Sequence, residues 1–364
     1  MMGSKPPKKQ QNMELMGYLN EKIPLIDGYL KKALTSDLMD KLLEREGFKH
    51  DAEALKKGIK EPLLYLYELG GKRIRAALTM LIIDTIDGDS NNFTEFSAIP
   101  EAIHNATLIQ DDIEDDSVSR RGKPAVHIKF GIDRALNAST AAYYLPVAFL
   151  KNSPKISREQ KYKIREEYEM DMLKLALGQA IDIELGKGSI NYKMKRTEGN
   201  YMEIIAYKTG TLMGLAAKIG GIVAGADERT IKALEDFGMN LGLAFQIHDD
   251  VLNLMPSDVA KNKGGVGEDI TDGKLTLPML KAMQPASDSD KKRFFEILGM
   301  KTAEMELITE AIDLINKYDG LKKAQAVAIE KGKAAADIID KMLPESESTE
   351  RLKDMVAFAL SRTN

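Results

Sequence analysis

The chain has 364 residues, of which 43% are hydrophobic, and this is enough to build a large core. Its 52 basic and 56 acidic residues give a net charge of −4, without the basic excess that nucleic-acid binding requires. It contains no cysteine, which excludes disulfides, zinc–thiolate sites and a cysteine nucleophile.

The N-terminal segment, residues 1–12, is basic and polar and lacks the apolar stretch of a signal peptide, so we expect a disordered leader. No apolar run reaches the roughly 20 residues of a membrane span. The closest, residues 210–226, is interrupted by Lys218. With the absence of cysteine, this favours an intracellular, cytoplasmic protein.

Helix-type spacing of apolar residues dominates the rest of the chain, and strand-like alternation is nearly absent. We therefore predict an all-α protein, with residues 13–364 forming one helical domain. The turn residues at 88–92 and 186–189 predict loops. The expected helices are 13–34, 36–47, 51–69, 73–86, 97–115, 132–150, 157–186, 197–218, 228–254, 275–283, 288–298, 302–317, 319–341 and 347–361.

An acidic cluster ends the helix expected at 97–115. Five of the six residues from Asp111 to Asp116 are acidic, and such crowding of like charges is unfavourable unless a ligand compensates it. Asp111, Asp112 and Asp115 are three and four residues apart, so they share one helix face. His104, seven residues earlier, extends the same stripe.

The motif recurs in the helix expected at 228–254. There Gln246, Asp249, Asp250 and Asn253 share a face in the same way. A single aspartate pair is usually a solvated surface, but two helical clusters with matched spacing indicate cation binding. Hard oxygen ligands on rigid helices suit Mg²⁺, which shares its coordination with water and substrate phosphates.

Other phosphate and metal motifs do not fit. An EF-hand loop beginning at Asp112 would need Gly at its sixth position and Glu at its twelfth, where the chain has Ser117 and Lys123. The glycine-rich segment 261–274 lacks the order of a P-loop and has no preceding strand for a dinucleotide site. We expect it to be a mobile lid over a phosphate site.

Basic residues accompany the acidic motifs. They can bind phosphates as bidentate arginine forks or as lysine point charges. They are Lys72 and Arg75 in "GGKRIR", Arg120 and Arg121 after the first motif, Lys208 beside Thr209 in "YKTG", and Lys263 and Lys274 in the lid.

Together these motifs resemble those of the trans-isoprenyl diphosphate synthases, over about residues 60–280. The quoted segments occur in the family's order. They are "GGKRIR", "DDIED" at 111–115, "RRGKPAVH", "GQAIDI", "YKTG", "FQIHDD", "DDVLN" at 249–253 and "DITDGKLTLP".

The resemblance implies a bundle of helices around a central cavity and a homodimer. It implies an allylic diphosphate held through Mg²⁺, usually three ions, with Asp111, Asp115 and Asp249 as the leading metal ligands and Asp112, Asp250 and Asn253 assisting. Many relatives have Asp at position 253, which leaves direct metal binding by Asn253 open.

The same resemblance assigns the remaining polar residues. Isopentenyl diphosphate would bind a metal-free pocket made by Lys72, Arg75, His104 and Arg121. Arg120, Lys208, Lys263 and Lys274 would bind the allylic diphosphate. Thr209 and Gln246 would line the reacting centre, with Lys208.

Product length follows from residues along the expected cavity. Ala106 and Thr107 are small where farnesyl synthases tend to carry an aromatic, which implies a tunnel open beyond fifteen carbons. Tyr143 and Tyr144 match the bulky pair that forms a deeper floor in eukaryotic-type geranylgeranyl synthases, although ordinary core packing also explains buried tyrosines. We therefore expect a twenty-carbon product.

Four alternatives stay open from the sequence. The product could be farnesyl diphosphate or a longer polyprenyl diphosphate. A class I terpene cyclase shares the first acidic motif but does not need the second diphosphate pocket at "GGKRIR", His104 and Arg121. A non-catalytic regulatory subunit generally loses acids from one motif, whereas both are nearly whole here.

Overall fold

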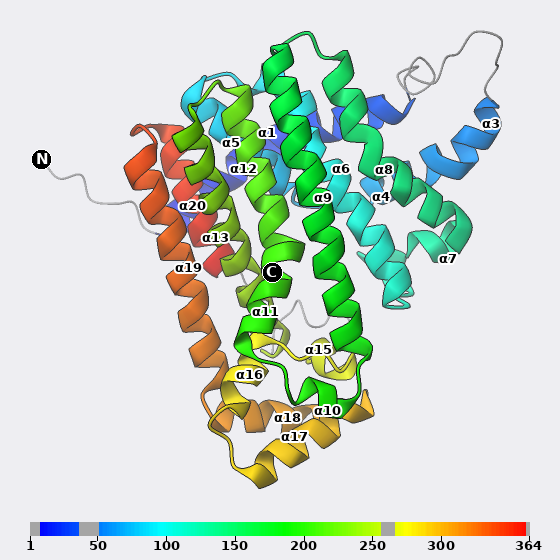
Figure 1. The fold of residues 1–364 in the computed structure, drawn as a ribbon, viewed down its shortest axis with the longest axis vertical. Helices are drawn as coiled ribbons and strands as arrows, with labels where there is room; N and C mark the ends of the chain where they lie inside the picture. Colours follow the sequence, from blue (N-terminus) through cyan, green and yellow to red (C-terminus); the bar gives the residue numbers. More distant parts are fainter. Residues whose placement is uncertain (1–7, 36–50, 256–265, 362–364) are drawn as a thin grey trace, which may run out of the picture. The chain divides into compact units, whose positions relative to one another are not determined.

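The computed structural model describes residues 8–35, 51–255 and 266–361 (Figure 1). The chain divides into two compact units. Unit 1 comprises Met1–Glu169, Leu215–Glu235 and Met342–Asp354. Unit 2 comprises Met170–Gly214, Asp236–Lys341 and Met355–Asn364. The single-domain expectation stays a prediction.

Unit 1 carries the N-terminal half of the helices and the two short strands of the described residues. Its elements are α1 (Lys8–Thr35), α3 (Ala52–Leu55), π-helix η1 (Lys56–Lys60), α4 (Glu61–Glu68), α5 (Ile74–Ile86), 3₁₀-helix η2 (Ser90–Phe93), α6 (Thr94–Glu114), β1 (Ser119–Arg120), β2 (Lys123–Pro124), α7 (Val126–Phe130) and α8 (Ile132–Asn152).

Four long helices are divided within their length between the two units. The remaining helices belong to unit 2, apart from Met342 at the end of α19, which belongs to unit 1. The shared helices are α9 (Arg158–Lys187), α12 (Thr211–Val223), α13 (Glu228–Asn253) and α20 (Glu347–Ser361). The helices of unit 2 are α10 (Ile190–Lys193), α11 (Glu198–Ile205), π-helix η3 (Ala206–Gly210), α15 (Glu268–Thr271), α16 (Leu277–Met283), α17 (Asp288–Met300), α18 (Met305–Lys317) and α19 (Gly320–Met342).

The all-α prediction is confirmed, and most long helices match their expected ranges. The helix expected at 36–47 lies outside the described residues, and α1 begins at Lys8, inside the expected leader. The predictions missed α7, α10 and α15, because helices of four or five residues are too short to leave a hydrophobic period. None of the helices in the described ranges is both long and apolar enough to cross a membrane.

A hairpin follows the first acidic motif. β1 and β2 pair antiparallel, with Ser119 opposite Pro124 and Arg120 opposite Lys123. The two turn residues, Arg121 and Gly122, have φ of 53° and 73°. Positive φ at both positions is typical of the tight turns whose twist matches paired strands. The hairpin turns the chain back, so that Arg120 and Arg121 lie close to α6 and the loop before α5.

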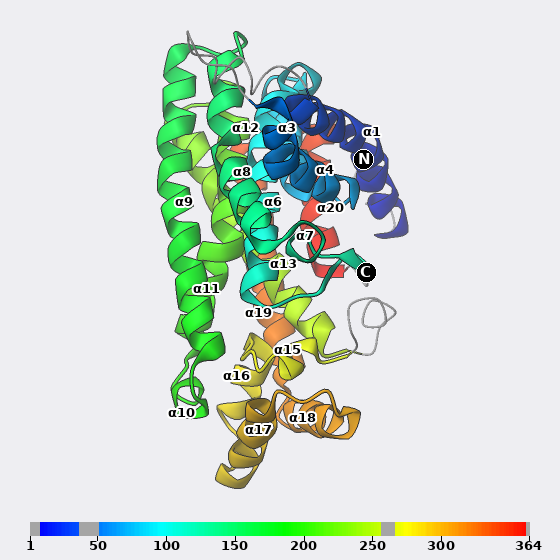
Figure 2. The same cartoon turned by 90° about the vertical axis from the view of Figure 1, so that its right-hand side faces the viewer.

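Helix α5 is the centre of unit 1. Ten of its thirteen residues are buried, and a helix that is apolar all round needs neighbours on every side. α12 packs against it, since Thr79 donates a hydrogen bond to the Ala216 carbonyl at 2.8 Å. α6 and α8 lie side by side in the same unit (Figure 2).

The core of unit 2 has two parts. α13 packs on α11 and α19 through Leu243, Ile247 and Val251. The second part brings α15 to α18 together around Phe294 and its neighbours. α10, α15, α17 and α18 therefore gather at one end of this unit (Figure 1).

Arg73, inside "GGKRIR", connects three helices of unit 1. Its guanidinium binds Asp27 of α1 at 2.7 Å, Glu101 of α6 at 3.0 Å and the Tyr67 carbonyl of α4 at 2.9 Å. The residue is 2% exposed and adopts a left-handed φ of 48°. Burial opposes its charged form, but Glu101 and Asp27 raise the pKa of Arg73. These bonds hold the loop that carries Lys72 and leads into α5, whose first turn carries Arg75.

We predict that Arg73→Met lowers the free energy of unfolding by about 3–5 kcal/mol, because it leaves the buried carboxylate of Glu101 without its cation. Urea denaturation measures this loss. Lys72→Met is the matched control: Lys72 is exposed, so its substitution changes stability by less than about 0.5 kcal/mol. Equal unfolding midpoints for the two variants would contradict the anchor role of Arg73.

Candidate active site

The first aspartate motif lies at the C-terminal end of α6. Asp111 is half-buried, Asp115 is exposed and Asp112 is fully buried. Arg120 of β1 donates from Nε to both Asp112 oxygens, at 2.9 and 3.2 Å, and also from Nη2. This charge-assisted pair neutralises one of the five crowded acids, which reduces their mutual repulsion.

The basic loop between α4 and α5 contacts the hairpin. The Arg121 guanidinium donates to the Gly70 carbonyl. Gly71 adopts a φ of 139°, which favours glycine, and a Cβ there would lie 3.0 Å from Arg121 Nη2. Lys72 follows and is exposed. The two sequence motifs "GGKRIR" and "RRGKP" are thus brought together in unit 1.

His104 of α6 lies in a strongly cationic environment. Burial, followed by Arg75 and Arg121 and then Arg73 and Arg120, holds the pKa of the His104 imidazole well below its ordinary value. The Arg75 Nε is buried and has no hydrogen-bond partner among the described residues. Several cations around a neutral imidazole and a buried, unsatisfied donor are the features of an anion-binding pocket.

The candidate chain-length residues lie between α6 and α8. Ser139 of α8 donates to the Ala106 carbonyl at 3.0 Å, and Thr107 donates to the His104 carbonyl at 2.8 Å. One turn further along α8, the Tyr143 hydroxyl donates to Gln110 Oε1 at 3.0 Å. Burial, with Asp111 next, raises the pKa of Tyr143. Tyr143 therefore lies beside the first motif.

Tyr144 points away from this contact. It is 67% exposed, on another face of α8 from half-buried Tyr143. The structure of unit 1 thus does not bring the two tyrosines together as one wall, because consecutive helical residues are about 100° apart.

The second aspartate motif lies on α13 in unit 2. Asp249 is half-buried, whereas Asp250 is buried and accepts hydrogen bonds from Tyr201 (2.7 Å) and Gln246 Nε2 (3.0 Å). Burial raises the pKa of Asp250 to about 7, with Asp249 and Asp182 adding to the effect. As in the first motif, the second aspartate is held by its neighbours and the first is the more accessible.

Lys208 and Thr209 lie in the π-helix η3. Lys208 Nζ binds Asp182 of α9 at 2.6 Å, and Thr209 donates to Gln246 Oε1 at 3.0 Å. A Cβ at Gly178 would lie 2.6 Å from the Tyr207 Cβ, so this glycine allows α9 to approach η3. π-helical turns often mark functional sites, since they reorient side chains within a helix. The turn connects Lys208 and Thr209 with the Gln246–Asp250 network.

Asn253 accepts hydrogen bonds from the backbone at the start of α15. Its Oδ1 accepts the Asp269 N–H at 3.2 Å, and its carbonyl accepts the Gly267 N–H at 2.8 Å. Asp269 is half-buried, and burial together with Asp250 raises its pKa. Lys274 forms a 3.2 Å ion pair with Asp272. Lys263 lies outside the described residues.

The carboxylates of the two motifs can supply some, but not all, of the ligands of a hard divalent cation. Within the described ranges, no three His, Asp or Glu side chains gather closely enough to hold a metal by themselves. Asp111 and Asp115 are one helical turn apart, so the first motif offers two accessible carboxylates, and Asp249 offers one in the second. Such a donor set suits Mg²⁺, which completes its shell with water and phosphate oxygens.

Sequence reasoning missed four residues of the second network. Asp182 and Asp269 lie inside "GQAIDI" and "DITDGK", so their motifs were recognised without assigning these acids. Tyr201 left no signal in the spacing. Arg196, before α11, also faces this network: burial lowers its pKa, opposed by Asp182, Tyr201 and Asp250.

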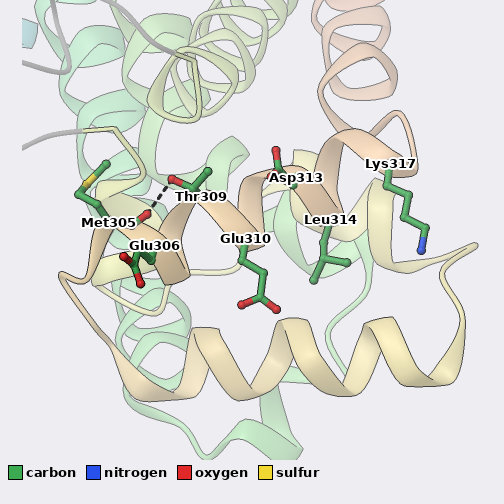
Figure 3. Close-up of a pocket in the computed structure, with 7 residues that line it drawn as sticks. All are labelled: Met305, Glu306, Thr309, Glu310, Asp313, Leu314 and Lys317. Atoms are coloured by element: carbon green, nitrogen blue, oxygen red, sulfur yellow. Dashed lines mark hydrogen bonds between the residues drawn. The ribbon is translucent and has the colours of Figure 1, made fainter.

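An open groove of about 590 Å³ occurs elsewhere in unit 2 (Figure 3). Its lining residues come from α18 and are Met305, Glu306, Thr309, Glu310, Asp313, Leu314 and Lys317. Glu310 is held by two 2.7 Å hydrogen bonds from Arg293. None of the candidate site residues lines this groove.

The polyprenyl synthetase family model matches residues 56–315. The short chain isoprenyl diphosphate synthase of Methanothermobacter thermautotrophicus is 35% identical over 299 residues, covering 82% of this chain and 88% of that protein. The geranylgeranyl diphosphate synthase of Sulfolobus acidocaldarius is 31% identical, covering 83% and 90%.

A solved structure agrees. Geranylgeranyl pyrophosphate synthetase from Pyrococcus horikoshii matches with a TM-score of 0.83 and 32% identity, over 96% of this chain and 99% of that one. The chain therefore belongs to the polyprenyl synthetase family. It is an all-helical prenyltransferase.

We predict that isopentenyl diphosphate, added without Mg²⁺, raises the pKa of His104, because a bound anion stabilises the imidazolium ion. By linkage, lower pH then strengthens this binding. Histidine NMR titrations with and without the ligand measure the shift, and the His104→Gln variant assigns the resonance. An unliganded pKa near 6.5, unmoved by the ligand, would contradict the cationic pocket.

Proposed function

We propose that the chain condenses isopentenyl diphosphate with an allylic diphosphate in the presence of Mg²⁺ to give geranylgeranyl diphosphate. The observation that supports this best is the cationic pocket around His104, in addition to the two aspartate motifs. Chain elongation needs to bind two diphosphates, one through metal ions and one without them. A terpene cyclase binds only one, so the second pocket favours elongation.

Isopentenyl diphosphate is assigned to the pocket of unit 1. Arg75 and His104 lie inside it, and Lys72 and Arg121 lie on the adjoining loop and hairpin. Neutral His104 contributes a ring N–H, while the arginines contribute charge and paired donors. Arg73 holds the loop that carries Lys72 and leads into α5.

The allylic diphosphate is assigned to the aspartate motifs, through Asp111, Asp115 and Asp249. When bound, Mg²⁺, proposed as three ions, acts as a Lewis acid that neutralises the leaving diphosphate. Asp112 orients Arg120, and Asp250 orients Gln246, so these buried acids position phosphate-binding and reaction-site groups. Lys208, Lys263 and Lys274 complete the basic partners, and Asn253 acts by holding Asp269.

The chemistry needs positioning more than a protein nucleophile. The allylic C–O bond breaks, and its electrons leave with the diphosphate. The double bond of isopentenyl diphosphate then forms the new C–C bond, and a proton passes to the released diphosphate. The Thr209 hydroxyl and the Gln246 carbonyl, held together at 3.0 Å, present oxygen dipoles that stabilise the allylic cation.

Incubation with labelled isopentenyl diphosphate, an allylic primer and Mg²⁺ tests the proposal. Extended prenyl diphosphates of twenty carbons support it. A cyclic hydrocarbon supports the cyclase, and binding without turnover supports a regulatory subunit.

We predict that Asp111→Asn and Asp249→Asn each lower kcat/KM by about 100-fold or more and raise the Mg²⁺ concentration required. In the double variant, the fold-loss in kcat/KM is far smaller than the product of the two single losses, because both aspartates act on one diphosphate. Asp116→Asn is the control: Asp116 is exposed with φ of 52°, a conformation that asparagine tolerates. Multiplicative losses would contradict a shared ligand.

A twenty-carbon product is supported by the geranylgeranyl synthases among the relatives and by small Ala106 and Thr107. Because Tyr143 is half-buried beside Gln110 and Tyr144 is exposed, we assign the barrier to Tyr143.

We predict that Tyr143→Ala adds one or more five-carbon units to the main product, whereas Tyr144→Ala does not change product length. Chromatography of the dephosphorylated products decides this, and unchanged lengths in both variants would remove the barrier.

A homodimer and a cytoplasmic location are also proposed. The dimer is supported by an apolar stripe on α8, where Ile132, Leu136, Tyr144 and Val147 are all at least 40% exposed. Sedimentation velocity measures the oligomeric state. The location is an expectation from the sequence.

A further inference from the structure

Lys274 is held by a tight turn at the end of α15. Its N–H donates to the Asp269 carbonyl at 2.8 Å, and the Gly273 N–H donates to the Ile270 carbonyl at 3.0 Å. Gly273 adopts a φ of 69°, a conformation that residues other than glycine rarely adopt. The direction in which Lys274 leaves this turn therefore depends on the orientation of the Gly273–Lys274 peptide.

Lys193 of α10 binds this peptide directly. Its Nζ donates to the Gly273 carbonyl at 2.5 Å, and the side chain is 4% exposed. The Lys193 N–H is itself fixed to the Ser189 carbonyl at 3.0 Å. A buried ammonium on a fixed backbone is therefore bonded to the turn, 80 residues away in the sequence.

The surroundings of Lys193 are cationic. Burial, followed by Lys301 and Arg196, lowers the pKa of Lys193 to about 8. Lys301, after α17, also contacts the turn, but through carbon: a Cβ at Gly273 would lie 3.1 Å from its Cγ and Cε. A buried cation beside two others is unfavourable for folding alone, and its hydrogen bond goes to a residue adjacent to Lys274.

We propose that Lys193 is a positioning residue for the allylic diphosphate. Lys193 holds the Gly273 carbonyl and thereby orients Lys274. This rests on the proposed function, in which Lys274 binds that diphosphate. Isopentenyl diphosphate is assigned to residues of unit 1, so its binding does not depend on the turn. The inference thus predicts an effect on one substrate and not on the other.

Steady-state kinetics with geranyl diphosphate and isopentenyl diphosphate test this split. Lys193→Met removes the donor, and we expect KM for geranyl diphosphate to rise about ten-fold, the size of one lost charge-assisted hydrogen bond. KM for isopentenyl diphosphate stays unchanged. Lys193→Arg keeps a charged donor and restores most of the affinity. Lys301→Met keeps the carbon contact with Gly273 and retains the wild-type KM at pH 7.

The pH dependence adds a readout that a merely structural role would not change. In the wild type, KM for geranyl diphosphate rises as pH passes through about 8, because Lys193 loses its proton and its bond loses the charge. Lys301→Met moves this rise to higher pH, since one of the two cations that lower the pKa is removed. Lys193→Arg abolishes it, because the guanidinium stays charged.

The outcomes separate the two proposals. An inactive wild type contradicts the proposed function and, with it, the role of Lys193 that rests on it. An active wild type with equal KM values in Lys193→Met, or with both KM values raised together, overturns the role of Lys193. If Lys193→Met does not fold, Lys193→Arg and Lys301→Met decide the question. The proposal is overturned if, in both variants, KM for geranyl diphosphate depends on pH as it does in the wild type.

Discussion

Hydrogen bonding of a buried aspartate is the interaction on which each of the two aspartate motifs depends. Asp112 is paired with Arg120, and Asp250 with Tyr201 and Gln246. Without these partners, two buried carboxylates would face further acids on the same helix turn, at a large cost in free energy. With them, the neighbouring Asp111 and Asp249 can be presented as accessible acids.

The pocket around His104 contains buried cations in place of buried carboxylates, and their partners matter in the same way. Four arginines surround an imidazole whose pKa is held low, and one buried guanidinium nitrogen has no protein partner in the described residues. Arg73 is satisfied by two carboxylates and a carbonyl, so its charge is used for the fold. The buried Nε of Arg75 has no protein partner among the described residues, and we propose that a diphosphate supplies one. Structural and ligand-binding cations can therefore be told apart by their partners.

The long helices and the two motifs were predictable because both depend on local spacing. Apolar periods of 3.6 residues located α8 and α13, and i, i+3 and i+4 spacing grouped the aspartates. Short α10 and α15 carry no such period, yet they provide Lys193 and Asp269. The "RRGK" hairpin was also missed, although an arginine–glycine pair in a two-residue turn gave a weak signal.

The sequence alone determined which residues could carry the chemistry, because residue type, helical spacing and motif order are properties of the chain itself. Tertiary structure decided which of them are engaged by other residues. It buried Asp112 and Asp250, directed the side chain of Asn253 to the backbone of α15, and separated Tyr143 from exposed Tyr144. These outcomes depend on contacts between segments far apart in the chain, such as Tyr201 with Asp250 or Lys193 with Gly273, and local spacing holds no record of such contacts.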